Sequence, residues 1–147
     1  MKALLLSILM TFLLQGPQAQ TPQNNTLLQQ ARLEYRKKHF LRTQLLLDSA
    51  EKTSGISPDL LHLKILNQRA LLPATTDPRF YQDMKQFEKL EDLRENCISF
   101  QSHYPQAPAK QQAEVRSVQE SLKEYPVAKV QFDENRHLQR TRQVRDQ

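Results

Sequence analysis

The chain has 147 residues, a formal net charge of +5 at pH 7 and only 2 glycines. So few glycines leave little room for phosphate-binding loops or a turn-rich β-sandwich, and the abundant Gln, Leu, Lys, Arg, Glu and Ala are good helix formers. Cys97 is the only cysteine, which excludes an intramolecular disulfide and favours a small buried apolar residue over an intermolecular bridge.

Residues 1–19 have the layout of a secretory signal peptide. Lys2 is followed by an apolar run from Ala3 to Met10 that is interrupted only by Ser7, and Ala19 is the expected last residue removed. The apolar stretch is shorter than the ~20 residues of a spanning helix. We therefore expect a secreted or periplasmic protein with no membrane span after signal removal, the alternative being an uncleaved N-terminal anchor. Residues 20–25 are polar, and a short disordered lead is expected there.

Two helices are predicted between residues 26 and 55. Asn25 or Thr26 can cap the first, and Gly55 can end the second in the left-handed conformation. Small and apolar residues recur on one face of each helix: Leu28, Ala31 and Tyr35 in the first, and Phe40, Thr43, Leu47 and Ala50 in the second.

Capping residues and prolines mark the following helices. Ser57 can cap a helix with Pro58 at its first position, and Pro73 ends it. Its apolar stripe consists of Leu61, Ile65 and Leu72. Asp77 and Pro78 then repeat the start signal.

The segment after Pro78 carries the strongest amphipathic pattern, and it predicts one long helix to about Tyr104, where Pro105 ends it. Apolar residues recur there every three or four positions: Phe80, Met84, Phe87, Leu90, Leu93, Cys97 and Phe100. A further helix is expected from Pro108 to Pro126. Residues 127–147 form either a final basic helix that docks or a frayed basic tail. With no segment typical of a strand, the predicted fold class is all-α, with five to six helices.

The segment 25–58 resembles a tetratricopeptide repeat, in which two antiparallel helices pack through small and aromatic residues. Ala31, Tyr35 and Phe40 match the small position of the first helix, a nearby aromatic and the aromatic after the turn. Thr43, Leu47 and Ala50 fit the small, large, small series of the second helix. The match departs from the family at Gln30, where leucine is usual, at Lys38–His39, which replaces the glycine of the turn, and at Thr43, which replaces alanine.

This resemblance, and a similar layout in exported helical-repeat proteins of Gram-negative bacteria, implies a short array of antiparallel helical hairpins over residues 26–126. The family implies binding of another protein through a concave groove lined by the first helices of the hairpins. Arg32, Tyr35 and Leu61 are the predicted partner-binding residues. The family implies no chemistry.

The residues themselves favour a protein that is not an enzyme and holds no cofactor. The four histidines (His39, His62, His103 and His137) have no paired metal-ligand spacing, and no hydrolase, Walker or dinucleotide motif is present. Cys97 lies on an apolar stripe, where inert packing is favoured over nucleophilic chemistry.

The C-terminal basic cluster supports a second hypothesis. Arg136, Arg140, Arg142 and Arg145 are its predicted basic surface. A basic helical bundle could bind anionic surfaces or hold unfolded clients in the periplasm. Because export argues against a genomic role, no nucleic-acid partner is expected. The third hypothesis is a secreted helical signalling protein.

Overall fold

The computed structural model describes residues 22–145, with side chains from residue 26, and this part of the chain contains helices and no strand. The helices are α1 (Pro22–Arg36), α2 (Phe40–Ser54), α3 (Pro58–Leu71), α4 (Pro78–Gln82), α5 (Lys85–His103), α6 (Ala109–Ser121), the 3₁₀ turn η1 (Leu122–Glu124) and α7 (Lys129–Arg145). The predicted all-α class is confirmed. The predicted number of helices was too low, because the described residues contain seven α-helices. The predicted signal peptide lies outside the described residues.

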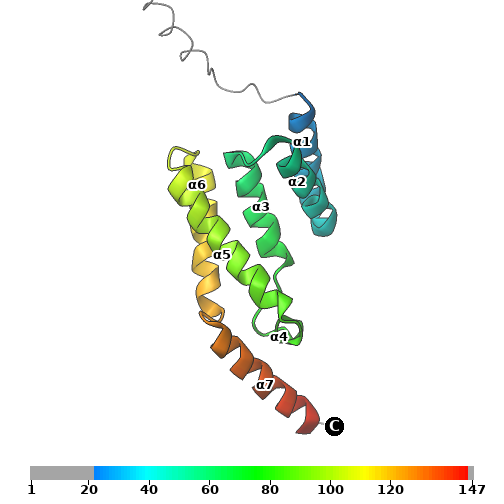
Figure 1. Ribbon diagram of the computed structural model, residues 1–147, viewed down its shortest axis with the longest axis vertical. Coiled ribbons are helices and arrows are strands. Elements are labelled where there is room, and N and C mark those ends of the chain that lie inside the picture. The colour runs from blue at the N-terminus through cyan, green and yellow to red at the C-terminus, as the bar shows by residue number, and fades with distance from the viewer. Residues whose placement is uncertain (1–21, 146–147) are drawn as a thin grey trace, which may run out of the picture.

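Successive long helices run up and down beside one another, forming a short array of helical hairpins (Figure 1). The helix α3 is central, because it contacts α1 and α2 on one side and α5 and α6 on the other. The helices α1, α3 and α6 line one face of the array, and α2, α3 and α5 line the opposite face.

Apolar residues of α3 enter two separate core clusters. Leu60 and Leu63 pack with Ala31, Leu47 and Ala50 of the first hairpin. Leu61 and Ile65 belong to the larger cluster formed with α4 to α7. The sequence pattern predicted only this second stripe, because a helix that is buried on two sides has no single apolar face. Each fully buried leucine contributes about 1.5–3 kcal/mol to stability.

The first helix begins earlier than predicted. The helix α1 starts at Pro22, so the predicted cap at Asn25 or Thr26 is wrong, as is the predicted disorder of residues 22–25. Proline favours the first helical position, because its missing N–H is not needed there and its φ is already helical.

The turn between α1 and α2 places a lysine where helices usually place glycine. Lys38 has φ 62°. The Lys38 N–H donates to the Tyr35 carbonyl and the His39 N–H to the Glu34 carbonyl. These two bonds are those of a helix C-terminus closed by one left-handed residue, which costs a non-glycine residue about 1–2 kcal/mol.

Three predicted helix boundaries are found at the expected residues. The Ser57 side chain accepts the Leu60 N–H at 3.2 Å, and the Asp77 carboxylate accepts the Arg79 N–H at 2.9 Å. Gly55 follows α2 with the predicted positive φ of 75°, although its ψ of −171° is extended rather than left-handed helical.

The predicted long helix from Pro78 to Tyr104 is broken at Asp83 and Met84. Asp83 is extended, and its carboxylate accepts the Lys85 N–H at 2.9 Å, which caps the start of α5. An aspartate can satisfy a free backbone donor in this way, so it competes with continuation of the helix. The break produces the short helix α4, which carries Phe80 and Tyr81 onto α7.

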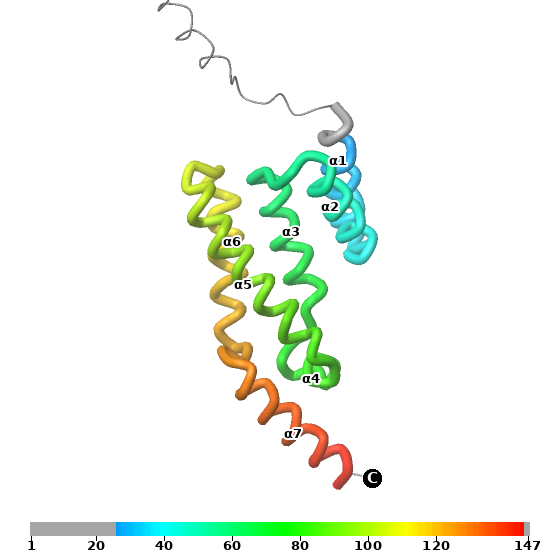
Figure 2. The backbone as a smooth tube through the Cα atoms, viewed as in Figure 1, coloured from blue at the N-terminus to red at the C-terminus, as the bar shows by residue number. Residues whose placement is uncertain are grey.

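The last segment forms a helix that docks at one end. Phe132 in the first turns of α7 is fully buried against Phe80, Tyr81 and Phe87. Beyond it the helix extends away from the array (Figure 2), and residues 140–145 are exposed. The docking alternative is therefore correct for the start of the helix only.

Candidate functional site

A groove of about 290 Å³ lies on the face formed by α1, α3 and α6. We call it the α1–α3–α6 groove. It is lined by Arg32, Tyr35 and Arg36 from α1, by Asp59, His62, Leu63 and Leu66 from α3, and by Lys110, Gln111 and Glu114 from α6. It therefore joins residues from both ends of the array.

Asp59 in the first turn of α3 connects the two walls of the groove. Its carboxylate forms an ion pair of 2.9 Å with Arg32 of α1 and accepts a hydrogen bond of 2.7 Å from the Gln111 side chain of α6. The N-terminus of a helix also favours a negative charge there. The carboxylate thus holds α1 and α6 at a defined separation across α3.

A second polar contact lies deeper in the groove. The His62 ring nitrogen Nε2 is 2.8 Å from a Glu114 carboxylate oxygen, and the His62 side chain is only 14 % exposed. Tyr35 lies near this pair, and burial together with the Glu114 charge raises the pKa of its phenol. The phenol is therefore neutral at physiological pH and can donate a hydrogen bond to an acceptor on a ligand.

The remaining charges of the groove are positive. Both lining carboxylates have partners, whereas Arg36 and Lys110 are exposed and form no ion pair among the described residues. The lining therefore carries three arginine and lysine side chains against two carboxylates, and Arg36 and Lys110 are the cations without an ion-pair partner beside the Tyr35 ring. This arrangement attracts an acidic segment and suits hydrogen bonding to carboxylates.

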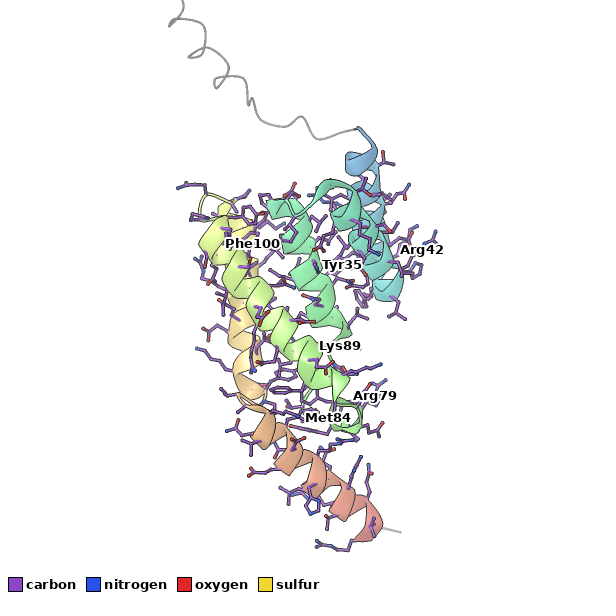
Figure 3. The ribbon with its side chains drawn as sticks, viewed as in Figure 1. Tyr35, Arg42, Arg79, Met84, Lys89 and Phe100 are labelled. Atoms are coloured by element: carbon purple, nitrogen blue, oxygen red, sulfur yellow. The ribbon has the colours of Figure 1, made fainter. Side chains whose placement is uncertain are left out.

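The structure brings together two of the three predicted partner-binding residues. Arg32 and Tyr35 both line the groove, and Figure 3 shows Tyr35 on the side of the first hairpin that faces α3. Leu61 does not line it, because it is 1 % exposed and belongs to the larger core cluster. On α3 it is Leu63 and Leu66 that reach the groove.

Sequence reasoning missed the residues that α6 contributes. Lys110, Gln111 and Glu114 share one face of α6 by their spacing. Gln111 and Glu114 each lie 52 positions from their hydrogen-bond partners on α3, Asp59 and His62. The only local signal was the face shared by Asp59 and His62, which are three residues apart.

The predicted C-terminal basic surface is divided between two sides of α7. At about 100° per residue, Arg136 and Arg140 lie on one side, and Arg142 and Arg145 lie on the other. Arg136 is partly buried, and its Nε is enclosed without a hydrogen-bond partner, whereas the other three are exposed. These arginines therefore do not form one continuous basic face.

The single thiol of the chain lies in the larger core cluster. Cys97 is fully buried, and burial raises the pKa of its thiol to about 12. No group of three or more histidine, cysteine, aspartate or glutamate side chains in residues 26–145 could hold a metal ion. No helix in the described part of the chain is both long and apolar enough to cross a membrane.

Comparison with protein-family models, curated proteins and solved structures found no match to this chain. The resemblance to tetratricopeptide repeats therefore stays a prediction, and the functional argument depends on the geometry of the groove.

Proposed function

We propose that this protein is a non-enzymatic binding module that takes an acidic segment of another protein into the α1–α3–α6 groove. The observation that carries the proposal is the pair of cations without an ion-pair partner, Arg36 and Lys110, on opposite walls of a groove that contains Tyr35. The predicted signal peptide and the resemblance to exported helical-repeat proteins support a partner in the periplasm or outside the cell.

Each part of the groove has a role in this binding. Arg36 and Lys110 would pair with carboxylates of the partner, and the Tyr35 ring would pack against an apolar or aromatic side chain. The Asp59 contacts hold α1 and α6 apart before the partner arrives, which lowers the entropic cost of binding. Since the cations lie in a groove with apolar contacts from Leu63 and Leu66, binding should weaken with salt but persist at physiological ionic strength.

The test is a capture experiment with the tagged chain from Gln20 to Gln147 against native envelope and secreted fractions, read by mass spectrometry at low and high salt. Lys110→Glu reverses a groove charge, and Lys89→Glu is its control, because Lys89 is an exposed lysine on α5, outside the groove. A stoichiometric partner should be retained by the control and weakened about tenfold by Lys110→Glu.

Two results would contradict the proposal. One is a stoichiometric partner that binds Lys110→Glu as tightly as the unmodified chain. The other is capture of many proteins that both variants share and that high salt abolishes, which would favour binding by the basic residues of α7.

A further inference from the structure

The first hairpin exposes cations and no carboxylate. Six lysines and arginines are exposed between residues 26 and 54, whereas none of the aspartates and glutamates of this fully described segment is. Glu34 is turned inwards, with a side chain only 12 % exposed that accepts hydrogen bonds from Lys37 and His39. Glu51 pairs with Lys64 of α3 at 2.6 Å. The outer surface of the hairpin is therefore net positive: Lys37 and Arg42 share Glu34 as an ion-pair partner, whereas Arg36, Lys38 and Lys52 form no ion pair among the described residues.

Exposed leucines lie among these cations. Leu41 and Leu45 are one helical turn apart on α2 and are 74 % and 69 % exposed. Arg42 lies between them in sequence, and Figure 3 shows it at the outer edge of the hairpin, away from α3. Two neighbouring leucines this exposed form an apolar patch for which the described helices provide no cover. We call Leu41, Leu45 and the exposed cations that precede or separate them in the chain, Arg36, Lys37, Lys38 and Arg42, the hairpin surface.

The turn of the hairpin is strained to keep a further cation there. Lys38 occupies the left-handed position that glycine takes at little cost, and it is exposed without an ion pair among the described residues. Strained backbone often marks a functional position. Here the strained residue is an exposed lysine three positions before Leu41 in the chain.

We propose that the hairpin surface binds the boundary between headgroups and acyl chains of an anionic lipid membrane. Exposed leucines bordered by lysines and arginines combine the two attractions that hold a protein surface in this boundary, apolar burial and pairing with anionic lipids. Arg36 and Lys38 are exposed and form no ion pair among the described residues, so their long side chains are available to mobile lipid headgroups. This site is separate from the α1–α3–α6 groove, except that Arg36 borders both.

The test is sedimentation of the chain from Gln20 to Gln147 with vesicles of phosphatidylglycerol and phosphatidylcholine, 30:70, and with phosphatidylcholine alone. Starting at Gln20 removes the apolar N-terminal run, which would bind lipid by itself. We expect binding only to the anionic vesicles. Replacing both leucines (Leu41→Asn with Leu45→Asn) should weaken it about tenfold.

Lys38→Gly separates the lipid contact from folding. Each cation near an anionic bilayer raises the partition coefficient roughly fivefold, so this variant should bind about fivefold more weakly. Because it also removes the strained left-handed lysine, its melting temperature should rise. A loss of binding in a more stable protein cannot come from unfolding.

Two controls place the site. Replacing the exposed arginines of α7 (Arg140→Gln, Arg142→Gln and Arg145→Gln) should change vesicle binding by less than about threefold, as should Lys110→Glu in the groove. The proposal is overturned if the α7 variant loses binding while the hairpin variants keep it. It is also overturned if the hairpin variants bind normally or if no binding to anionic vesicles occurs. Binding to an acidic polyglutamate peptide instead of vesicles would point to a protein partner.

Discussion

Replacing Phe132 by alanine should detach α7 from the array. The Phe132 ring is fully buried, with centroids 5.4 Å from Phe80, 5.3 Å from Tyr81 and 5.5 Å from Phe87. It is also the one fully buried residue of α7, while residues 140–145 are exposed. The attachment of the helix thus depends on this side chain.

The expected cost follows from the size of the buried ring. Removing a buried phenylalanine costs about 3–5 kcal/mol through lost transfer energy and the cavity that remains. The helix α7 has 17 residues, which is near the limit of stability for an isolated helix in water. Once detached it should melt, so the variant should lose helical signal as well as free energy of unfolding.

Urea denaturation followed by circular dichroism measures both effects, and limited trypsin digestion should release the arginine-rich end of α7 sooner in the variant. Leu138→Ala is the matched control, since Leu138 lies on the same helix and is 55 % exposed, and it should change stability by less than about 0.5 kcal/mol. If Phe132→Ala kept the denaturation midpoint and the helical signal of the unmodified chain, the docking described here would be wrong.

Three further predictions concern the core and the helix ends. Leu47→Asp places an unpaired charge at a fully buried site and should lower the free energy of unfolding by about 4 kcal/mol or more. Leu45→Asp on the same helix, at a 69 % exposed site, should lower it by less than about 0.5 kcal/mol. Equal melting temperatures for the two variants would refute the assignment of the α2 core face. Asp83→Ala removes the cap of α5 and should lower the free energy of unfolding by about 1 kcal/mol in urea titration, and an unchanged value would show that the cap is dispensable. Burial raises the pKa of the Cys97 thiol from 9.0 to about 12, so the folded state keeps the proton; this contribution to stability is present below pH 9 and is lost as the pH rises towards 12. At pH 8 Ellman's reagent should therefore react with Cys97 far more slowly in the folded chain than in urea, and equal rates would show that the thiol is accessible.

The sequence predicted features that depend on near neighbours in the chain. Ser57 and Asp77 carry their capping oxygens within three residues of the donors they satisfy, so the starts of α3 and α4 could be located. The helix α5 could likewise be predicted from its apolar repeat, because that repeat arises from one buried face. In the groove, Arg32 and Tyr35 could be proposed because they lie on the hairpin that carries the family resemblance.

Features that depend on tertiary contacts could not be predicted. The break at Asp83 lets Phe80 and Tyr81 pack against Phe132. A local sequence pattern does not predict such a contact, because the residues lie some fifty positions apart in the chain. Leu61 was wrongly predicted to line the groove. Its spacing places it on the apolar stripe of α3, but does not show whether that stripe faces the groove or a core cluster. The contribution of α6 to the groove likewise depends on its packing against α3.

The helix α3 is shared by both core clusters, so the first hairpin cannot complete its core without it. Leu60 and Leu63 serve the first hairpin, while Leu61 and Ile65 serve the helices that follow. As the chain is synthesised, the first hairpin has nothing to cover its apolar side until α3 follows. A chain cut at Gly55 would leave leucine-lined surfaces in water on both fragments, and each should aggregate when expressed alone. Folding should therefore be a single cooperative event centred on the middle of the chain.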